Sequence, residues 1–214
     1  MDYLEDTLSL SRFSFQKNYP PFPRITLEHN FKTKSHSLPR LFEGVTKMTQ
    51  LMRKIEQEAI LDTLRYDSEK YKGDAFEFFV ELFLSLHPTD NRVGVYNYKP
   101  NQENDNGVDG IGVNINNQKS VIQIKYRSNT QTELSSNKDS LANLITDGMM
   151  THGVVADMEN QKNFRHFVFT TATGLNFYTD QEMFKSKVRC FGINDFKSLL
   201  DNNIIFWNKV REVI

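Results

Sequence analysis

The chain has 214 residues, of which 38% are hydrophobic and 25% charged, which is ordinary for a soluble globular protein with one core and room for an appended arm. Its formal net charge is −1, and its single cysteine, Cys190, excludes an internal disulfide framework and a zinc site built from several cysteines. No apolar run reaches the length of a membrane span, and the first twenty residues lack the apolar stretch of a secretory signal. We therefore expect an intracellular, cytoplasmic protein.

The first third of the chain predicts an irregular arm followed by two helices. Residues 1–38 contain clustered prolines and no periodic pattern. Apolar residues then recur at steps of three and four and predict a helix over Leu41–Leu64. A second helix is expected over Ser68–Leu86, because Pro88 disfavours helical geometry at His87. On this second helix three acidic side chains share one face: Asp74, Glu77 and Glu81.

The rest of the chain alternates between strands and helices. Three strands are expected at 92–98, 107–113 and 119–127, followed by a helix over 137–150 that a Ser136–Asp139 capping box would open. Further strands are predicted at 154–156, 166–171 and 188–191, and further helices at 178–185, 195–200 and 206–213. This alternation predicts an α/β protein with a mixed sheet.

The net charge of −1 hides two segments of opposite charge. Residues 8–54 contain nine basic and two acidic side chains, a balance of +7, whereas residues 56–109 contain five basic and twelve acidic side chains, a balance of −7. Two solvated surfaces would explain this pattern. A basic arm that contacts phosphates beside an acidic segment that holds metal would explain it equally well.

Two of the expected strands carry a candidate catalytic group. Gln123 and Lys125 are two residues apart and therefore share one face of a strand, while Ile122 and Ile124 point into the core. A lysine beside such apolar neighbours is costly unless a group pairs with it. Asp109 on the preceding strand is the expected partner.

The pairing of the two strands depends on the loop between them. A loop of Asn116 and Asn117 alone would place Asp109 opposite Ile124, and the shared face would be lost. A three-residue loop with Asn114 opposite Gln118 places Asp109 opposite Gln123 instead, as would a bulge near Gly110 or Gly112. We predict one of the latter arrangements.

These side chains suit the hydrolysis of phosphodiesters. Oxygen atoms of Glu77, Asp109 and Gln123 are the ligands that hard divalent cations prefer. A bound cation neutralises a phosphate oxygen and acidifies water, while Lys125 can orient or deprotonate that water. The sequence contains no rival histidine pair, Ser/His/Asp set or glycine-rich phosphate loop.

The same residues resemble the PD-(D/E)xK nuclease superfamily. The matching motifs are Gly73-x-x-Phe76-Glu77, Gly107-Val108-Asp109 and the segment Val121–Lys125. The closer similarity is to the Mrr-type restriction endonuclease-like branch, in which glutamine replaces the second acidic residue in a QxK signature. The expected order of elements, αβββαβ, is that of the restriction endonuclease-like core, and the segment Phe191–Leu200 also resembles that branch. The resemblance covers roughly residues 70–200.

The resemblance implies a magnesium-dependent DNA endonuclease, with Mn²⁺ able to replace Mg²⁺, of the restriction, homing or repair type. It implies that Asp109 and Gln123 hold metal, that Lys125 is catalytic and that Glu77 is a further ligand or a base. We further expect a homodimer, a nuclease domain over residues 67–214 and a basic arm and helix over residues 1–66 for DNA contact or dimerisation. The candidate DNA contacts are Lys32, Lys34, Arg40, Lys47 and Arg127. No membrane or nucleotide cofactor is expected.

Simpler explanations exist for the same features. Gln123 lacks the negative charge of the superfamily's fuller pattern, so the chain could be a nuclease fold kept as a DNA-binding or regulatory protein, and an RNA nuclease is a third option. Asp109 and Gly110 could form a plain turn, and Lys125 could protect an edge strand from aggregation. Glu77 could be a surface residue whose role Glu81 or Asp74 takes. None of the five histidines is assigned a catalytic role.

Overall fold

The computed structural model describes residues 38–61, 67–86, 91–101, 107–135, 141–156, 163–177 and 185–214. Its helices are α2 (Leu38–Phe42), α3 (Met48–Leu61), α4 (Ser68–Leu86), α5 (Leu141–Met150), α7 (Ile193–Leu200) and α8 (Ile204–Val213). Its strands are β1 (Val95–Pro100), β2 (Gly110–Asn114), β3 (Lys119–Lys125), β4 (Leu134–Ser135), β5 (His166–Thr170), β6 (Leu175–Asn176) and β7 (Val188–Phe191). The predicted N-terminal arm lies outside the described residues.

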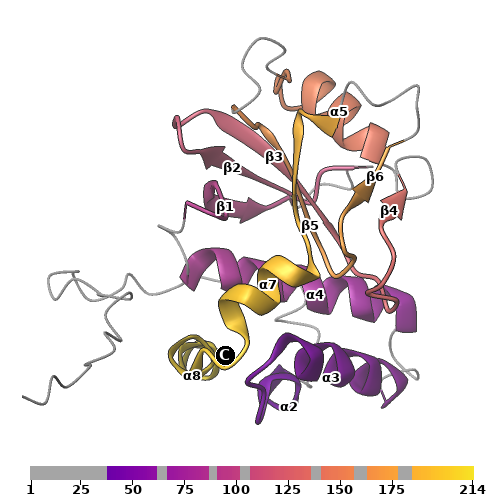
Figure 1. The fold of residues 1–214 in the computed structure, drawn as a ribbon, viewed down its shortest axis with the longest axis vertical. Coiled ribbons are helices and arrows are strands. Elements are labelled where there is room, and N and C mark those ends of the chain that lie inside the picture. Colours follow the sequence, from indigo (N-terminus) through magenta and orange to yellow (C-terminus); the bar gives the residue numbers. More distant parts are fainter. Residues whose placement is uncertain are drawn as a thin grey trace, which may run out of the picture.

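A five-stranded mixed sheet organises the molecule, in the order β1-β2-β3-β5-β7. The pairs β1/β2 and β2/β3 are antiparallel, and the pairs β3/β5 and β5/β7 are parallel. Figure 1 shows α4 crossing one face of this sheet, with α2, α3, α7 and α8 on the same side and α5 on the other side. The prediction of an α/β protein with a mixed sheet is therefore confirmed.

The side of the sheet covered by α4 holds a large core rich in aromatic residues, which we call the aromatic core. It joins α2, α3, α4, α7 and α8 to one face of the sheet. The Phe79 ring stacks on Trp207 at 6.1 Å between ring centroids, and Phe196 meets Phe83 and Phe191 edge-on at 5.1 and 4.7 Å. Trp207 is fully buried and anchors the last helix in this core.

The opposite side holds a smaller aliphatic core, which we call the α5-side core. It is formed by residues of α5, the sheet and the loops beside it: Val108, Val121, Leu134, Leu141, Leu144, Val154, Val168, Ala172 and Val188. Helix α5 approaches the chain closely here, since a Cβ on Gly107 would lie 2.8 Å from Asn143 atoms. The two cores lie on opposite sides of the same strands.

The single helix predicted over residues 41–64 is wrong, because two helices occupy this region. Gly44 adopts a φ of +69° and separates α2 from α3. The Asp201 carboxylate then accepts a hydrogen bond from the backbone N–H of Met48 at 2.8 Å and satisfies the first turn of α3. Met48 and Met52 are buried in the aromatic core, so the first two helices pack on the same core as α4.

The strand predicted at 154–156 is also wrong. Helix α5 is followed by Gly153 with a φ of +65°, and the N–H of Val154 donates to the Gly148 carbonyl at 2.7 Å. This is the hydrogen bonding of a helix C-terminal cap, which uses the backbone groups that a strand would need. Val154 is buried as the hydrophobic contact of that cap.

The limits of several other elements differ from their predicted limits by a few residues. Helix α4 matches its prediction at both ends, whereas β1 begins at Val95, β2 begins at Gly110, and α7 and α8 each begin two residues early. The short parallel pair of β4 and β6 was not predicted. The capping box, most of the helix expected at 178–185 and residues 62–66 lie outside the described residues.

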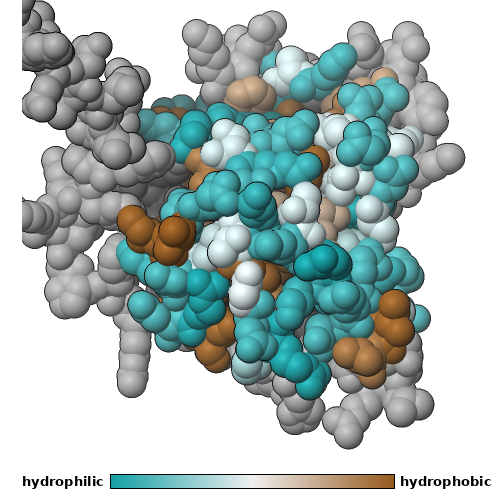
Figure 2. Space-filling view, turned by 60° about the horizontal axis from the view of Figure 1, so that its bottom comes forward, coloured by the Kyte–Doolittle hydropathy of each residue, from teal (hydrophilic) through white to brown (hydrophobic). Residues whose placement is uncertain are grey.

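The outer face of the first and last helices is mainly hydrophilic, with separate hydrophobic spots (Figure 2). Exposed apolar side chains lie at the end of α3 and at the start of α8: Ile60, Leu61, Ile204 and Ile205. Isolated side chains of this kind are ordinary on protein surfaces. Within the described residues, no helix combines the length and apolar character needed to cross a bilayer.

Candidate active site

The hairpin of β2 and β3 has the three-residue loop that the sequence argument required. The Asn114 N–H donates to the Gln118 carbonyl at 2.9 Å, and the side-chain oxygen of Asn114 accepts the N–H groups of Asn116 and Gln118. The register pairs Gly110 with Ile122. The predicted three-residue loop is therefore confirmed, whereas the β2–β3 ladder ends at this pair and the placement of Asp109 opposite Gln123 stays a prediction.

Asp109 lies immediately before β2 and is tied to β3 by two contacts. Its N–H donates to the Ile122 carbonyl at 2.9 Å, and its carboxylate Oδ2 accepts the Ile124 N–H at 2.6 Å. The Asp109 carboxylate thus accepts the Ile124 N–H, which a backbone carbonyl would accept if β2 extended this far. Because the hairpin turn lies at 115–117, Asp109 and Gly110 do not form the plain turn that was the simpler explanation.

Gln123 lies fully buried on the α5 side of β3. Ile122 and Ile124 point into the aromatic core, while Val121 points into the α5-side core, so Gln123 and Lys125 lie on the latter side. Neither the oxygen nor the nitrogen of the Gln123 amide has a hydrogen-bond partner among the described residues. Leaving a buried polar group unpaired costs about 1–3 kcal/mol. A hydrogen-bond donor or a cation could therefore bind the Gln123 amide oxygen.

Lys125 ends β3 and is partly exposed. Its carbonyl accepts hydrogen bonds from the Thr170 hydroxyl at 2.8 Å and from the Thr171 N–H at 3.3 Å. Strand β3 lies between β2 and β5, and the edges of the sheet are β1 and β7. The β2 ladder ends at Gly110–Ile122, however, and within the described residues Lys125 pairs with Thr170 of β5 alone, so the explanation that it protects an open edge remains.

Glu77 comes to this region from the other side of the sheet, on α4. It is partly buried, and its charge reaches Tyr98 on β1. Burial raises the pKa of Tyr98 well above its usual range, and the charges of Glu77, Asp109 and Glu81 raise this pKa further. The structure thus gives Glu77 and Asp109 a common neighbour, although Glu77 does not lie on the Gln123 face. Glu81 is buried, and Asp74 pairs with Lys70 at 3.4 Å.

Tyr98 was missed by the sequence argument. An alternating strand through residue 98 gives it no special position, but β1 contains a register shift between Tyr96 and Lys99. Asn97 within that shift adopts a φ of +52°. The shift sets the Tyr98 hydroxyl 3.4 Å from the Asp109 carbonyl, to which it donates. The asparagine before it was the one available signal, since this residue type tolerates a left-handed backbone.

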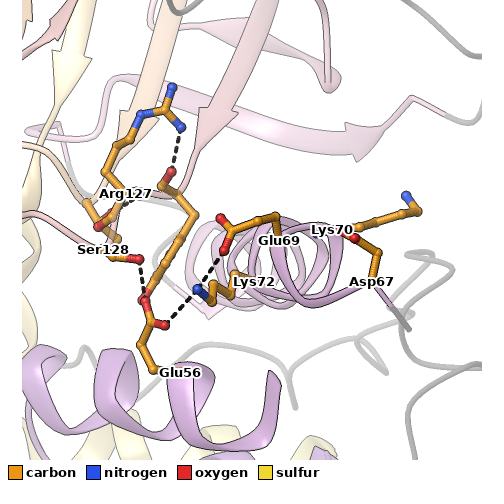
Figure 3. Close-up of polar contacts among 9 residues, drawn as sticks. Glu56, Asp67, Glu69, Lys70, Lys72, Arg127 and Ser128 are labelled. Carbon is orange, nitrogen blue, oxygen red and sulfur yellow. Dashed lines mark hydrogen bonds and ion pairs between the residues drawn. The ribbon is translucent and has the colours of Figure 1, made fainter. Parts of the chain in front are cut away.

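A polar network fixes the chain directly after Lys125 (Figure 3). The Glu56 carboxylate on α3 accepts hydrogen bonds from the Tyr126 hydroxyl at 2.8 Å and from the Ser128 hydroxyl, and pairs with Lys72 of α4 at 2.9 Å. Lys72 also pairs with Glu69 at 2.8 Å. Burial alone would raise the pKa of Glu56, but the hydrogen bonds to its carboxylate together have the larger effect. The pKa of Glu56 is therefore lowered. The network joins two helices to the end of β3.

The predicted DNA contacts fall into three groups. Lys32 and Lys34 lie outside the described residues. Arg40 donates to the buried Glu58 carboxylate at 3.0 and 3.2 Å and keeps 61% of its side chain exposed, while Lys47 is exposed. Arg127 donates to the Tyr126 carbonyl at 2.7 Å and is partly buried, which lowers its pKa. Their contact with DNA stays a prediction.

Comparison with known proteins gives no name to this arrangement. No protein-family model, curated protein or solved structure matches the chain. Within the described residues, no three histidine, cysteine or acidic side chains are grouped closely enough to hold a metal ion by themselves. The class of the site therefore has to be argued from Asp109, Gln123 and Lys125.

Proposed function

We propose that this protein is a divalent-metal-dependent endodeoxyribonuclease with a restriction endonuclease-like core. The observation that carries the proposal is that the Asp109 carboxylate accepts the backbone N–H of Ile124, the residue between Gln123 and Lys125 on β3. The order of α4, β1, β2, β3, α5 and β5 supports it, because this is the αβββαβ order of the superfamily that the motifs resemble.

The donor set fits a hard cation. Asp109 would supply a charged oxygen and Gln123 a neutral one, and the Gln123 oxygen, which has no hydrogen-bond partner among the described residues, is a buried acceptor that a cation would satisfy. The resemblance gives Glu77 the role of a further ligand or a base, although Glu77 lies on the α4 side of the sheet and away from the Gln123 face. When bound, Mg²⁺ or Mn²⁺ would neutralise charge on the scissile phosphate and acidify water.

Lys125 would act on the attacking water and on the phosphate. It would orient the water, or accept its proton, while the water oxygen bonds to phosphorus and the bond to the leaving nucleoside oxygen breaks. Lys125 would accept the proton only as the neutral amine; as the ammonium, present from the start or formed by that transfer, its charge would stabilise the negative charge that develops on the phosphate oxygens. The leaving nucleoside oxygen would take its proton from solvent. The Thr170 and Thr171 contacts to its carbonyl, together with the Glu56 network, hold the backbone that carries it.

The test is cleavage of supercoiled plasmid DNA with Mg²⁺ or Mn²⁺. We expect the wild type to nick or linearise the plasmid and EDTA to stop the reaction. Lys125→Ala should lower the single-turnover rate at least about a hundredfold. Lys119→Ala is the matched control, because Lys119 is an exposed lysine at the other end of the same strand. Equal rates for Lys125→Ala and wild type would refute the proposed site, and faster cleavage of RNA would change the substrate.

A second candidate is a nuclease fold that binds DNA without cutting it. It is favoured by the neutral Gln123 and by the position of Glu77 on the α4 side of the sheet. In that case the wild type would bind a DNA duplex with salt-dependent affinity and leave plasmid uncut across metals, salts and substrates. The plasmid experiment therefore separates the two candidates.

The rest of the chain would supply DNA contacts and a second active site. We propose that residues 1–66 contact DNA or a second copy, and that residues 67–214 carry the nuclease site. Cutting both strands calls for two sites, which favours a homodimer. Sedimentation with and without duplex DNA would test this assembly.

A further inference from the structure

Tyr98 lies against the chain segment that carries Asp109. A Cβ built on Gly110 would fall 2.2 Å from Cε2 and 2.7 Å from Cζ of the Tyr98 ring, so the ring rests directly on the Gly110 backbone. No side chain larger than that of glycine fits beneath it. The hydroxyl of the same ring donates to the Asp109 carbonyl at 3.4 Å.

Tyr98 adds to the backbone contacts that hold Asp109. Asp109 precedes the first residue of β2, its N–H donates to the Ile122 carbonyl at 2.9 Å, and its carbonyl accepts the Asn101 N–H at 2.9 Å. Its carboxylate reaches the Ile124 N–H at 2.6 Å. A rotation of the peptide that follows Asp109 would move this carboxylate away from β3. The Tyr98 hydroxyl and ring oppose that rotation from the α4 side.

We propose that Tyr98 is the positioning residue of Asp109: its ring on Gly110 and its hydroxyl on the Asp109 carbonyl hold the Asp109 carboxylate against the Ile124 amide. This inference rests on the proposed nuclease function and deepens it. Burial makes the largest contribution to the raised pKa of Tyr98, and the negative charges of Glu77, Asp109 and Glu81 raise this pKa further. The phenol therefore stays a protonated donor throughout the neutral pH range.

The test compares Tyr98→Phe with Tyr96→Phe. Both variants remove one hydroxyl from β1 and keep the ring, but the Tyr96 hydroxyl bonds to Asn91 at 3.0 Å, away from Asp109. The first readout is amide hydrogen exchange at Ile124, followed by NMR, which reports the Asp109 contact whether or not the protein is an enzyme. We expect exchange to become about tenfold faster in Tyr98→Phe and to stay unchanged in Tyr96→Phe.

The second readout is single-turnover cleavage at saturating DNA. Tyr98→Phe should lower the maximal rate about fivefold while the DNA dissociation constant changes less than twofold, because Tyr98 acts through Asp109 rather than on DNA. Unchanged Ile124 exchange in Tyr98→Phe would overturn the inference. If Tyr98→Phe speeds exchange at Ile124 but the wild type cuts no nucleic acid, the nuclease function is refuted. The role of Tyr98 in positioning Asp109 would still hold.

Discussion

The two sides of the central sheet differ in what they bury. The aromatic core stacks the rings of α4, α7 and α8 against β3, β5 and β7. The α5-side core is smaller and aliphatic, and it borders two fully buried polar side chains, Gln123 and His166. One side therefore supplies most of the stability, and the other gives up stability to keep polar groups in place. Functional sites commonly carry such a cost.

The largest effect is expected from the aromatic core. Phe196→Ala removes a ring that meets Phe76, Phe83 and Phe191 at 5.8, 5.1 and 4.7 Å. We expect it to lower the free energy of unfolding by about 4 kcal/mol, measured by urea titration. DNA cleavage by the molecules that remain folded should be unchanged. Phe177→Ala, at a partly buried ring beside the α5-side core, should cost only about 1 kcal/mol. Equal losses would remove the contrast between the two sides.

The second effect is a pH dependence that arises on the α5 side. Burial, with a smaller contribution from the charge of Arg165, lowers the pKa of His166 to about 4, against 6.5 for an ordinary histidine. The unfolded chain thus takes up a proton at a higher pH than the folded chain. The stability that neutral His166 contributes is complete above about pH 6.5 and is lost as the pH falls towards 4.

We expect this loss to reach about 2 kcal/mol between about pH 7 and about pH 4.5. His166→Asn removes the titrating group, so urea titrations of this variant over the same range should show a flatter dependence than the wild type. Curves of equal slope would contradict the assignment. His152→Asn, which changes a histidine that is only partly buried, is the control and should keep the wild-type slope.

The third effect is a gain in stability. Gln123→Met replaces the unpaired buried amide by an apolar chain of similar length, and should raise the metal-free unfolding free energy by about 1 kcal/mol. We expect Mn²⁺ to stabilise the wild type and Gln123→Met to abolish this stabilisation, which thermal unfolding with and without Mn²⁺ measures. Gln57→Met, on the exposed face of α3, should change neither quantity. A destabilised variant that still responds to Mn²⁺ would show that the amide has a structural partner and no metal.

The smallest effect comes from Glu56, at the junction of α3, α4 and β3. Its pKa is lowered in the folded protein, so its contribution is present above the usual pKa of 4.5 and is lost as the pH falls through the lowered value. We expect Glu56→Gln to cost about 0.5 kcal/mol near pH 7, since the side chain is one-third exposed. The difference from wild type should vanish in acid. Glu43→Gln, at an exposed position, serves as the control, and a difference that persists in acid would contradict this assignment.

The predictable parts of the structure are those that depend on local signals. The limits of α4 follow from its apolar pattern and from Pro88, and the three-residue hairpin loop between Asn114 and Gln118 is one of the arrangements that the sequence argument predicted. The start of α3 was not predictable, because its first N–H is satisfied by Asp201, which lies far along the chain. Tyr98 was missed for a related reason. A one-residue register shift in β1 decides where its ring lies, and alternation alone predicts none.

The hairpin loop at 115–117 also sets a rule for sequence variation. Its length decides which residues of β3 pair with β2. Adding or deleting a single residue would exchange the two faces of β3 relative to β2 and turn Gln123 and Lys125 away from the α5 side. A change of two residues would keep each face on its own side. If the proposed site is functional, insertions and deletions in this loop should therefore survive in diverging copies of the gene as pairs, whereas single ones should be lost.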